Sequence, residues 1–296
     1  MTTSDINRTL VQNLIRSQFP EWSDLPIEKI AFEGWDNRTF RLGNHMLIRL
    51  PSAEAYAESV HKEQKWLPFL APELSLEIPE PLGMGHPCDM YPWNWSIYKW
   101  IQGKSANLYT FNDEQLEIIA HQLSHFLKEL HQIKIDRAPE PGPHNFFRGA
   151  HPSVYDKETR RAITNLKSFL DCERMIALWE KSLESRWHQP FVWIHGDLSA
   201  ANIIIRENRL KAVIDFGGTG VGDPACDLSI AWTFFKNKSR EVFKKNMDLD
   251  SNTWERARGW VLWKALVILE SQVDKTSPEA KRNLKIVDDI VRTSLV

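Results

Sequence analysis

The spacing of apolar residues differs between the two parts of this 296-residue chain. In its first third, apolar residues occur mostly in short runs separated by turn residues, and those between residues 27 and 50 predict β-strands. A helix with one apolar face is predicted over residues 7–19, where Pro20 ends it, and a second runs from a Ser52 cap to about Leu67. The N-terminal part is therefore predicted to be rich in β-structure.

Apolar residues recur every three or four positions after Asn112, which forms a predicted capping pair with Gln115. One helical face is marked by Leu116, Ile119, Leu123, Leu127 and Leu130. Further helices are predicted over residues 156–170, 174–187, 224–236, 253–271 and 278–292. The pattern predicts an α+β fold of two lobes, a β-rich lobe over residues 1–102 and an α-rich lobe over residues 103–296.

Two apolar runs near residue 200 predict a β-hairpin. They cover residues 203–205 and 210–214, and polar residues separate them. A turn near Asn208 and Arg209 would place Asn202 opposite Asp215 in an antiparallel pair. An amide oxygen beside a carboxylate suits Mg²⁺, which takes its other ligands from water and substrate phosphates. The sequence thus predicts a magnesium site formed by Asn202 and Asp215.

Asp197 lies five residues before Asn202, in the loop that enters this hairpin. A carboxylate there can accept the proton of a hydroxyl group or orient its oxygen for attack on a phosphoryl group. Phosphoryl transfer divides its work in this way between a carboxylate and metal-binding side chains. We therefore expect Asp197 to be a catalytic residue.

Three short segments carry a resemblance to a known family. His195-Gly196-Asp197, four residues, and Asn202 are followed by Asp215-Phe216-Gly217 and by a G-D-P-x-x-D-L segment over residues 222–228. These segments resemble the protein-kinase-like superfamily, and more closely its aminoglycoside phosphotransferase branch. The resemblance implies a bilobal protein-kinase-like fold, with Asp197 as the catalytic residue and Asn202 and Asp215 as metal ligands. It also implies that His195 and Asp227 support the catalytic loop. Asp223 reads more simply as a helix N-cap followed by proline.

The same resemblance implies an ATP (or GTP) site with Mg²⁺ in the N-terminal lobe. A hairpin containing Gly34 would cover the phosphates, although any hairpin turn would look similar. Arg49 stands where kinases carry a lysine and can grip phosphate, with Glu63 as its partner unless Glu63 is simply a solvated surface charge. Backbone groups near Lys99 and Ile101 would bond the adenine. The aromatic residues before them are expected to build the core.

The resemblance implies that the acceptor is a small molecule with a free hydroxyl group. An aminoglycoside-like or other antibiotic is the leading candidate, and a metabolite of the choline, homoserine or sugar type is the alternative. Candidate lining residues, for which core packing or solvation is the commoner role, are Asp227, Glu270, Trp260, Trp263 and residues 144–148. Two other interpretations stay open. Arg49 is compatible with a non-catalytic nucleotide-binding module, and a metal-dependent hydrolase could use His195, Asp197, Asp215 and Asp223.

Composition excludes several classes of partner. The formal net charge of −2 provides no basic surface for nucleic acid. The most apolar later run, residues 260–269, contains Lys264 and is too short to span a membrane, and the first residues lack an apolar signal segment. Three scattered cysteines predict neither disulfides nor a zinc site. We expect a cytoplasmic protein without nucleic-acid or membrane partners. The sequence does not indicate its oligomeric state.

Overall fold

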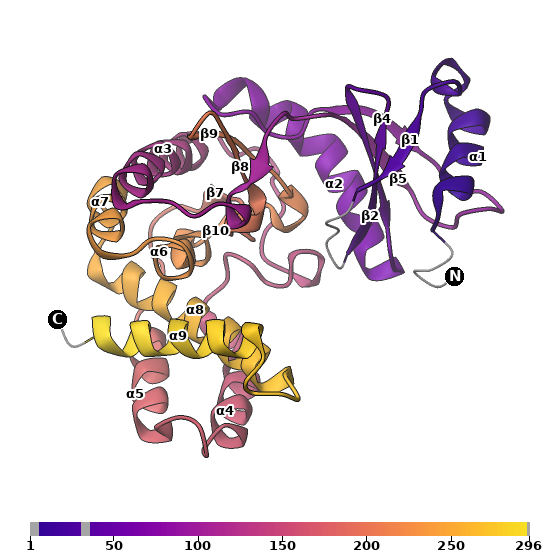
Figure 1. Ribbon diagram of the computed structural model, residues 1–296. Helices are drawn as coiled ribbons and strands as arrows, with labels where there is room; N and C mark the ends of the chain where they lie inside the picture. The colour runs from indigo at the N-terminus through magenta and orange to yellow at the C-terminus, as the bar shows by residue number, and fades with distance from the viewer. Residues whose placement is uncertain (1–5, 31–35, 295–296) are drawn as a thin grey trace. The chain divides into compact units, whose positions relative to one another are not determined.

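The computed structural model describes residues 6–30 and 36–294 (Figure 1). The chain forms two compact units, and neither is a single stretch of sequence. The first unit comprises Met1–Lys104, Ile204–Arg206 and Lys211–Gly217, and the second comprises Ser105–Ile203, Glu207–Leu210 and Gly218–Val296.

The first unit is built on an antiparallel sheet of five strands in the order β1-β2-β3-β5-β4. The strands are β1 Ile27–Lys29, β2 Asn37–Leu42, β3 Met46–Pro51, β4 Pro81–Gly85 and β5 Trp95–Lys99. Gly43 has a φ of +56° in the turn between β2 and β3, a conformation that glycine adopts without strain. This turn pairs Leu42 with Met46 and fixes the register of β3, which carries Arg49.

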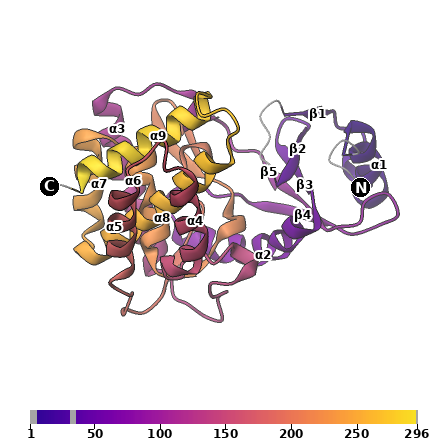
Figure 2. The same ribbon diagram turned by 90° about the horizontal axis from the view of Figure 1, so that it is seen from below.

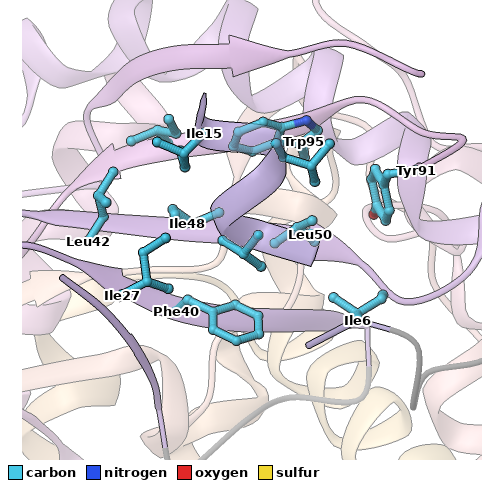
Figure 3. Close-up of a cluster of buried hydrophobic side chains, with 12 residues drawn as sticks. Ile6, Ile15, Ile27, Phe40, Leu42, Ile48, Leu50, Tyr91 and Trp95 are labelled. Carbon is cyan, nitrogen blue, oxygen red and sulfur yellow. The ribbon is translucent and has the colours of Figure 1, made fainter. Parts of the chain in front are cut away.

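Alternation along β3 sends its side chains to two different faces of the sheet. Ile48 and Leu50 are fully buried in a cluster with residues of α1 (Arg8–Gln18) and β5, as Figure 3 shows. The α1 helix begins where predicted, because the Asn7 side chain accepts a hydrogen bond from the Leu10 backbone N–H at 3.1 Å. Arg49 lies between the two buried residues of β3 and so projects from the opposite face.

That opposite face is contacted by α2 (Glu54–Leu70). The predicted Ser52 cap is wrong: Ala53 is the N-cap residue, and no side chain caps this helix. The helix also continues past Leu67, through Pro68, because Leu70 is fully buried and the last turn is held by packing. Glu63 is a buried residue of α2.

The second unit is mainly helical (Figures 1 and 2). Its helices are α3 Asp113–Gln132, α4 Asp156–Asn165, α5 Cys172–Leu183, α6 Ile230–Thr233, α7 Asn237–Met247, α8 Ser251–Ser271 and α9 Pro278–Thr293. The long α8 helix packs against α4, α5 and α9, and most of its residues are buried. Gly259 permits its approach to α5, since a Cβ atom there would lie 2.4 Å from the Ser182 Oγ. No helix in the described part of the chain is long and apolar enough to cross a membrane.

The helices of the second unit agree with the prediction at the start of α3 and differ from it elsewhere. The predicted capping box of Asn112 and Gln115 is present at the start of α3. The helix predicted over residues 224–236 is instead a 3-10 segment, Pro224–Ser229, followed by the single turn of α6. The α7 helix was not predicted, because Ser239 and Arg240 contribute to its buried face and hide the apolar period.

The predicted hairpin is formed by β8 (Ile203–Arg206) and β9 (Arg209–Val213), in a sheet of order β6-β8-β9 that begins with β6 (Lys104–Ser105). Its turn is Glu207–Asn208, with φ values of +54° and +60°, the conformation of a two-residue type I′ turn. The turn thus lies one residue before the predicted position near Asn208 and Arg209. Within the first unit, the Val213 N–H donates to the Glu77 carbonyl at 3.0 Å.

Candidate active site

The segment that contains Asp197 follows β7 (Val192–Ile194), which pairs with β10 (Gly220–Gly222). Asp227 is fully buried, and its carboxylate accepts hydrogen bonds from the backbone N–H of His195 at 2.7 Å and of Gly196 at 2.8 Å. Burial raises the pKa of this carboxyl group, although the His195 and Gly196 N–H groups favour its charged form. Asp227 therefore holds the backbone of the loop that leads to Asp197, as the resemblance implied.

The backbone conformation and the close packing at position 196 of this loop require glycine. Its φ is +85°, and a Cβ atom there would lie 2.2 Å from the backbone oxygen of Gly218. The neighbouring His195 is fully buried, and its Nδ1 accepts a hydrogen bond from the Asp197 N–H at 3.2 Å. His195 thus fixes the backbone of the loop, which agrees with its predicted supporting role.

Asp197 itself is partly open to solvent, with 42% of its side chain exposed. Its Oδ1 lies 2.8 Å from the Nζ of Lys264 on α8. Burial alone would raise the pKa of the Asp197 carboxyl group, but the charge and hydrogen bond of Lys264, together with Arg148 and His195, bring it below the ordinary value. Asp197 is therefore ionised at neutral pH, the state needed to orient a hydroxyl group or accept its proton.

Asn202 is held by the same loop. Its Nδ2 donates to the backbone oxygen of Asp197 at 2.8 Å, and the residue is 9% exposed. Because the amide nitrogen is engaged, the Oδ1 atom remains as the hydrogen-bond acceptor of this side chain. This orientation fits the predicted role of Asn202 as an oxygen ligand of Mg²⁺.

In the first unit, Arg49 joins two carboxylates. Its guanidinium lies 3.3 Å from Glu63 Oε1 and 2.8 Å from Asp215 Oδ1. Glu63 is 3% exposed and also accepts a hydrogen bond from the Tyr98 hydroxyl. The predicted pairing of Glu63 with Arg49 is present, and the alternative of a solvated surface charge is wrong.

Burial shapes the charges of this group. Burial would lower the pKa of Arg49, but Asp215 and Glu63 raise it well above the ordinary value. Burial raises the pKa of Glu63, and the charge of Arg49 opposes that change. Asp215 engages one carboxylate oxygen with Arg49, and its role as a metal ligand stays a prediction. In the described part of the chain, no three His, Cys, Asp or Glu side chains are grouped to hold a metal ion.

The remaining nucleotide-site predictions have less structural support. The backbone N–H of Lys99 donates to the Glu80 carbonyl at 2.9 Å, so it is not free for an adenine. Ile101 follows the end of β5 by two residues. Gly34 lies outside the described residues, and its role stays a prediction.

The G-D-P-x-x-D-L segment contains an ion pair that the sequence did not indicate. Asp223 caps the 3-10 segment as predicted, by accepting from the Ala225 N–H at 3.0 Å. Its carboxylate also accepts from the Arg256 Nε of α8 at 2.6 Å. No local sequence pattern joins two residues that are 33 positions apart, so Arg256 was missed.

The candidate acceptor-site residues have mixed outcomes. Trp260 and Trp263 are 2% and 9% exposed, which confirms core packing as their main role. Glu270 is engaged by Arg161 at 3.0 Å and by Asn165 at 2.5 Å. Lys264, the partner of Asp197, was noted in the sequence only as an interruption of an apolar run.

Comparison with known proteins agrees with this geometry. The family model described as "Phosphotransferase enzyme family" matches residues 27–260, a range that includes Arg49, Asp197, Asp215 and Asp227. The chain belongs to this family. Membership confirms the predicted family and the assignment as a phosphotransferase. No curated protein matches the sequence of this phosphotransferase.

Solved structures share the fold of this phosphotransferase. The GDP complex of aminoglycoside 2′-phosphotransferase-IIIa has a TM-score of 0.71 at 18% identity, over 97% of this chain and 99% of that one. The streptomycin–ATP complex of APH(2″)-IIa has a TM-score of 0.62 at 20% identity, over 97% and 96%. A macrolide 2′-phosphotransferase from Brachybacterium faecium has a TM-score of 0.60 at 17% identity, over 94% and 97%. These likenesses confirm the predicted protein-kinase-like α+β fold.

Proposed function

We propose that this phosphotransferase moves the γ-phosphoryl group of ATP or GTP to a hydroxyl group of a small molecule. The observation that carries the proposal is Asp197, an ionised and partly exposed carboxylate on a loop fixed by His195 and Asp227. A carboxylate in this state can orient a hydroxyl oxygen and accept its proton as the bond to phosphorus forms.

Other residues have separate roles in the proposed reaction. Asn202 and Asp215 would each give an oxygen to Mg²⁺, which neutralises phosphate charge when bound. Arg49 would hold phosphate oxygens, and Glu63 keeps its guanidinium in position. Because Lys264 contacts Oδ1 of Asp197, the acceptor hydroxyl would use Oδ2 or share Oδ1 with Lys264.

The nucleotide donor is supported by solved structures of similar fold, which are complexes with GDP, ATP and ADP. We assign the adenine or guanine contacts to backbone groups at Lys99 and Ile101. The Lys99 carbonyl is the stronger candidate there, because its N–H is already bonded. A phosphate-covering role for the hairpin that contains Gly34 is part of the same proposal.

For the acceptor, an antibiotic is the leading class, because structures of similar fold are described as complexes with kanamycin, streptomycin and gentamicin or as macrolide phosphotransferases. A metabolite of the choline, homoserine or sugar type is the second candidate. We also propose a cytoplasmic location and no nucleic-acid partner, in keeping with the formal net charge of −2.

The test compares the protein with Asp197→Ala, using γ-labelled ATP and GTP, Mg²⁺ and a panel of antibiotics and hydroxylated metabolites, with mass detection of the product. We expect transfer by the unaltered protein and none by the variant, while titration calorimetry shows that the variant still binds nucleotide. Asp136→Ala, which removes an exposed carboxylate, is the matched control. Nucleotide binding without product on any acceptor would favour a non-catalytic binding module. Metal binding without nucleotide binding would favour a hydrolase.

A further inference from the structure

Arg148 is an arginine without a polar partner near the catalytic carboxylate. In the part of the chain that the structure describes, its guanidinium makes no hydrogen bond and no ion pair, and its ring contacts are with Trp260 at 5.3 Å and Trp263 at 5.0 Å. A guanidinium has five N–H donors and no acceptor, and buried or half-buried examples normally meet a carboxylate, phosphate or carbonyl oxygen. Arg148 is half-buried and leaves these donors unused.

The guanidinium of Arg148 lies beside two indole rings, which offer it no hydrogen-bond acceptor. Trp260 and Trp263 meet at a steep angle, and the Tyr155 ring stacks on Trp263 at 3.8 Å. A cation over an aromatic face is attracted by the ring, but this contact uses none of its N–H groups. The N–H groups of Arg148 are therefore available to an oxygen-rich group.

The loop that carries Arg148 has a fixed and strained backbone. Phe146 and Phe147 have φ values of +52° and +54°, which are uncommon for bulky residues. Asn145 is fully buried, and it accepts from the Gly142 N–H at 3.0 Å and donates to the Arg148 carbonyl at 3.1 Å. Strain of this kind persists only where surrounding contacts enforce it, so the position of Arg148 is built into the fold.

Arg148 and Lys264 both face the region of Asp197. The two Trp residues below Arg148 lie on α8 within one turn of Lys264, whose Nζ contacts Asp197. The charge of Arg148 also reaches Asp197 and contributes to its low pKa. The hydroxyl group that Asp197 would activate is thus approached by two cationic side chains.

The acidic side chains of Glu158 and Glu270 already have hydrogen-bond partners. Glu158 accepts a hydrogen bond from the Trp263 Nε1 at 2.8 Å, and Glu270 is bound by Arg161 and Asn165. Arg161 also lies 4.0 Å from Glu158 Oε1, so a cation already lies beside both carboxylates. A polycation near Asp197 would meet Lys264 and the unpaired Arg148, and like charges brought together oppose binding.

We propose that the acceptor carries a carboxylate near the hydroxyl group that is phosphorylated, and that Arg148 binds this carboxylate. The inference rests on the proposed function and deepens it, because it selects an anionic acceptor among antibiotics and metabolites. Polycationic aminoglycosides are disfavoured.

The experiment separates a bacterial metabolite extract by ion exchange into anionic, neutral and cationic pools, and adds kanamycin and gentamicin as defined polycations. Each is incubated with the protein, Mg²⁺ and γ-labelled ATP or GTP, and labelled products are identified by mass. We expect label in a hydroxy acid from the anionic pool. Arg148→Gln should raise the KM for that acid by about tenfold to a hundredfold, since a charged hydrogen-bond pair is lost.

Two further variants separate binding from folding. Arg148→Lys keeps a cation over the indole rings and should restore part of the affinity. Lys244→Gln removes a different cation that lies 5.1 Å from Trp254, and it should leave the KM unchanged. All variants are checked by thermal melting before kinetic comparison, and the nucleotide KM should be the same in each.

The outcomes distinguish this inference from the proposed function. Label in the neutral or cationic pools or in an aminoglycoside, or an anionic product whose KM is insensitive to Arg148→Gln, would overturn the carboxylate inference and leave phosphotransfer standing. Absence of label from every pool and both antibiotics would refute the proposed function, and the inference with it.

Discussion

The buried ion pair between Asp223 and Arg256 allows a quantitative prediction for Arg256→Met. The side chains are 4% and 1% exposed, and the Arg256 Nε lies 2.6 Å from Asp223 Oδ2. Arg256 also donates to the Ser185 Oγ at 2.9 Å and the Thr253 Oγ1 at 3.0 Å. Methionine would fill most of the volume but leave the Asp223 charge buried without its partner.

The expected cost follows from this burial. Removing one partner of a buried pair lowers the free energy of unfolding by about 3–5 kcal/mol, far more than a surface pair contributes. For a unit of this size, that loss corresponds to a melting temperature lower by about 6–20 °C. Burial outweighs Arg256 and raises the pKa of Asp223, so the pair itself is not a net source of stability. Adding Asp223→Asn, which keeps an acceptor for the Ala225 N–H, should therefore recover part of the loss.

Urea denaturation of the single and double variants measures these free energies, and a double-mutant cycle isolates the coupling. Arg160→Met is the control, because Arg160 pairs with Asp156 while both side chains are 39% exposed, and it should cost about 1 kcal/mol or less. If Arg256→Met costs no more than this control, or if the double variant shows simple addition of the single effects, the reasoning from burial is refuted.

Three further predictions concern the candidate site. Lys264→Met should raise the pKa of Asp197, because it removes the cation that lowers it. The acidic limb of the kcat/KM profile, where activity is lost as pH falls, should then move to higher pH. An unchanged limb would show that Asp197 is not the group that titrates there. Asp227→Asn should replace one acceptor of the loop N–H groups by a donor, lower stability by about 1–3 kcal/mol and reduce kcat more than nucleotide affinity, as denaturation and steady-state kinetics will test. Arg49→Met should leave Glu63 buried without its cation and weaken nucleotide binding, whereas Arg49→Lys should retain most of the stability; equal calorimetric affinities for both variants would contradict the charge argument.

Local signals in the sequence were sufficient for many elements of the fold. The N-cap Asn7 and the capping box of Asn112 specify two helix starts through bonds between residues three positions apart, so they can be read directly. The α7 helix escaped prediction because its buried face includes Arg240, which is stabilised by the backbone oxygen of Ala231 at 2.7 Å. Such a face is created by tertiary contacts, and a hydrophobicity pattern does not reveal it.

The residues of the candidate site also divide into those that a sequence motif reveals and those that only tertiary packing brings together. Asp197 and Asp227 belong to short motifs, and their roles in the loop could be anticipated from the resemblance. Lys264 and Arg148 lie outside any motif, and only the packing of α8 beside the 142–149 loop brings their charges toward Asp197. The prediction missed the hairpin turn at Glu207–Asn208 by one residue. Several polar residues tolerate the left-handed backbone angles of such a turn, so the sequence does not show which two of them adopt those angles.

The divided sequence of the first unit affects how the protein is made. On the ribosome, the five-stranded sheet and the Arg49–Glu63 pair can form early, because all their residues precede Lys104. Asp215, the second carboxylate partner of Arg49, emerges only after most of the chain has been translated. A nascent or truncated product that stops before residue 204 would therefore contain every residue of the sheet and of the Arg49–Glu63 pair, but it would lack the Asp215 carboxylate that completes the charge network.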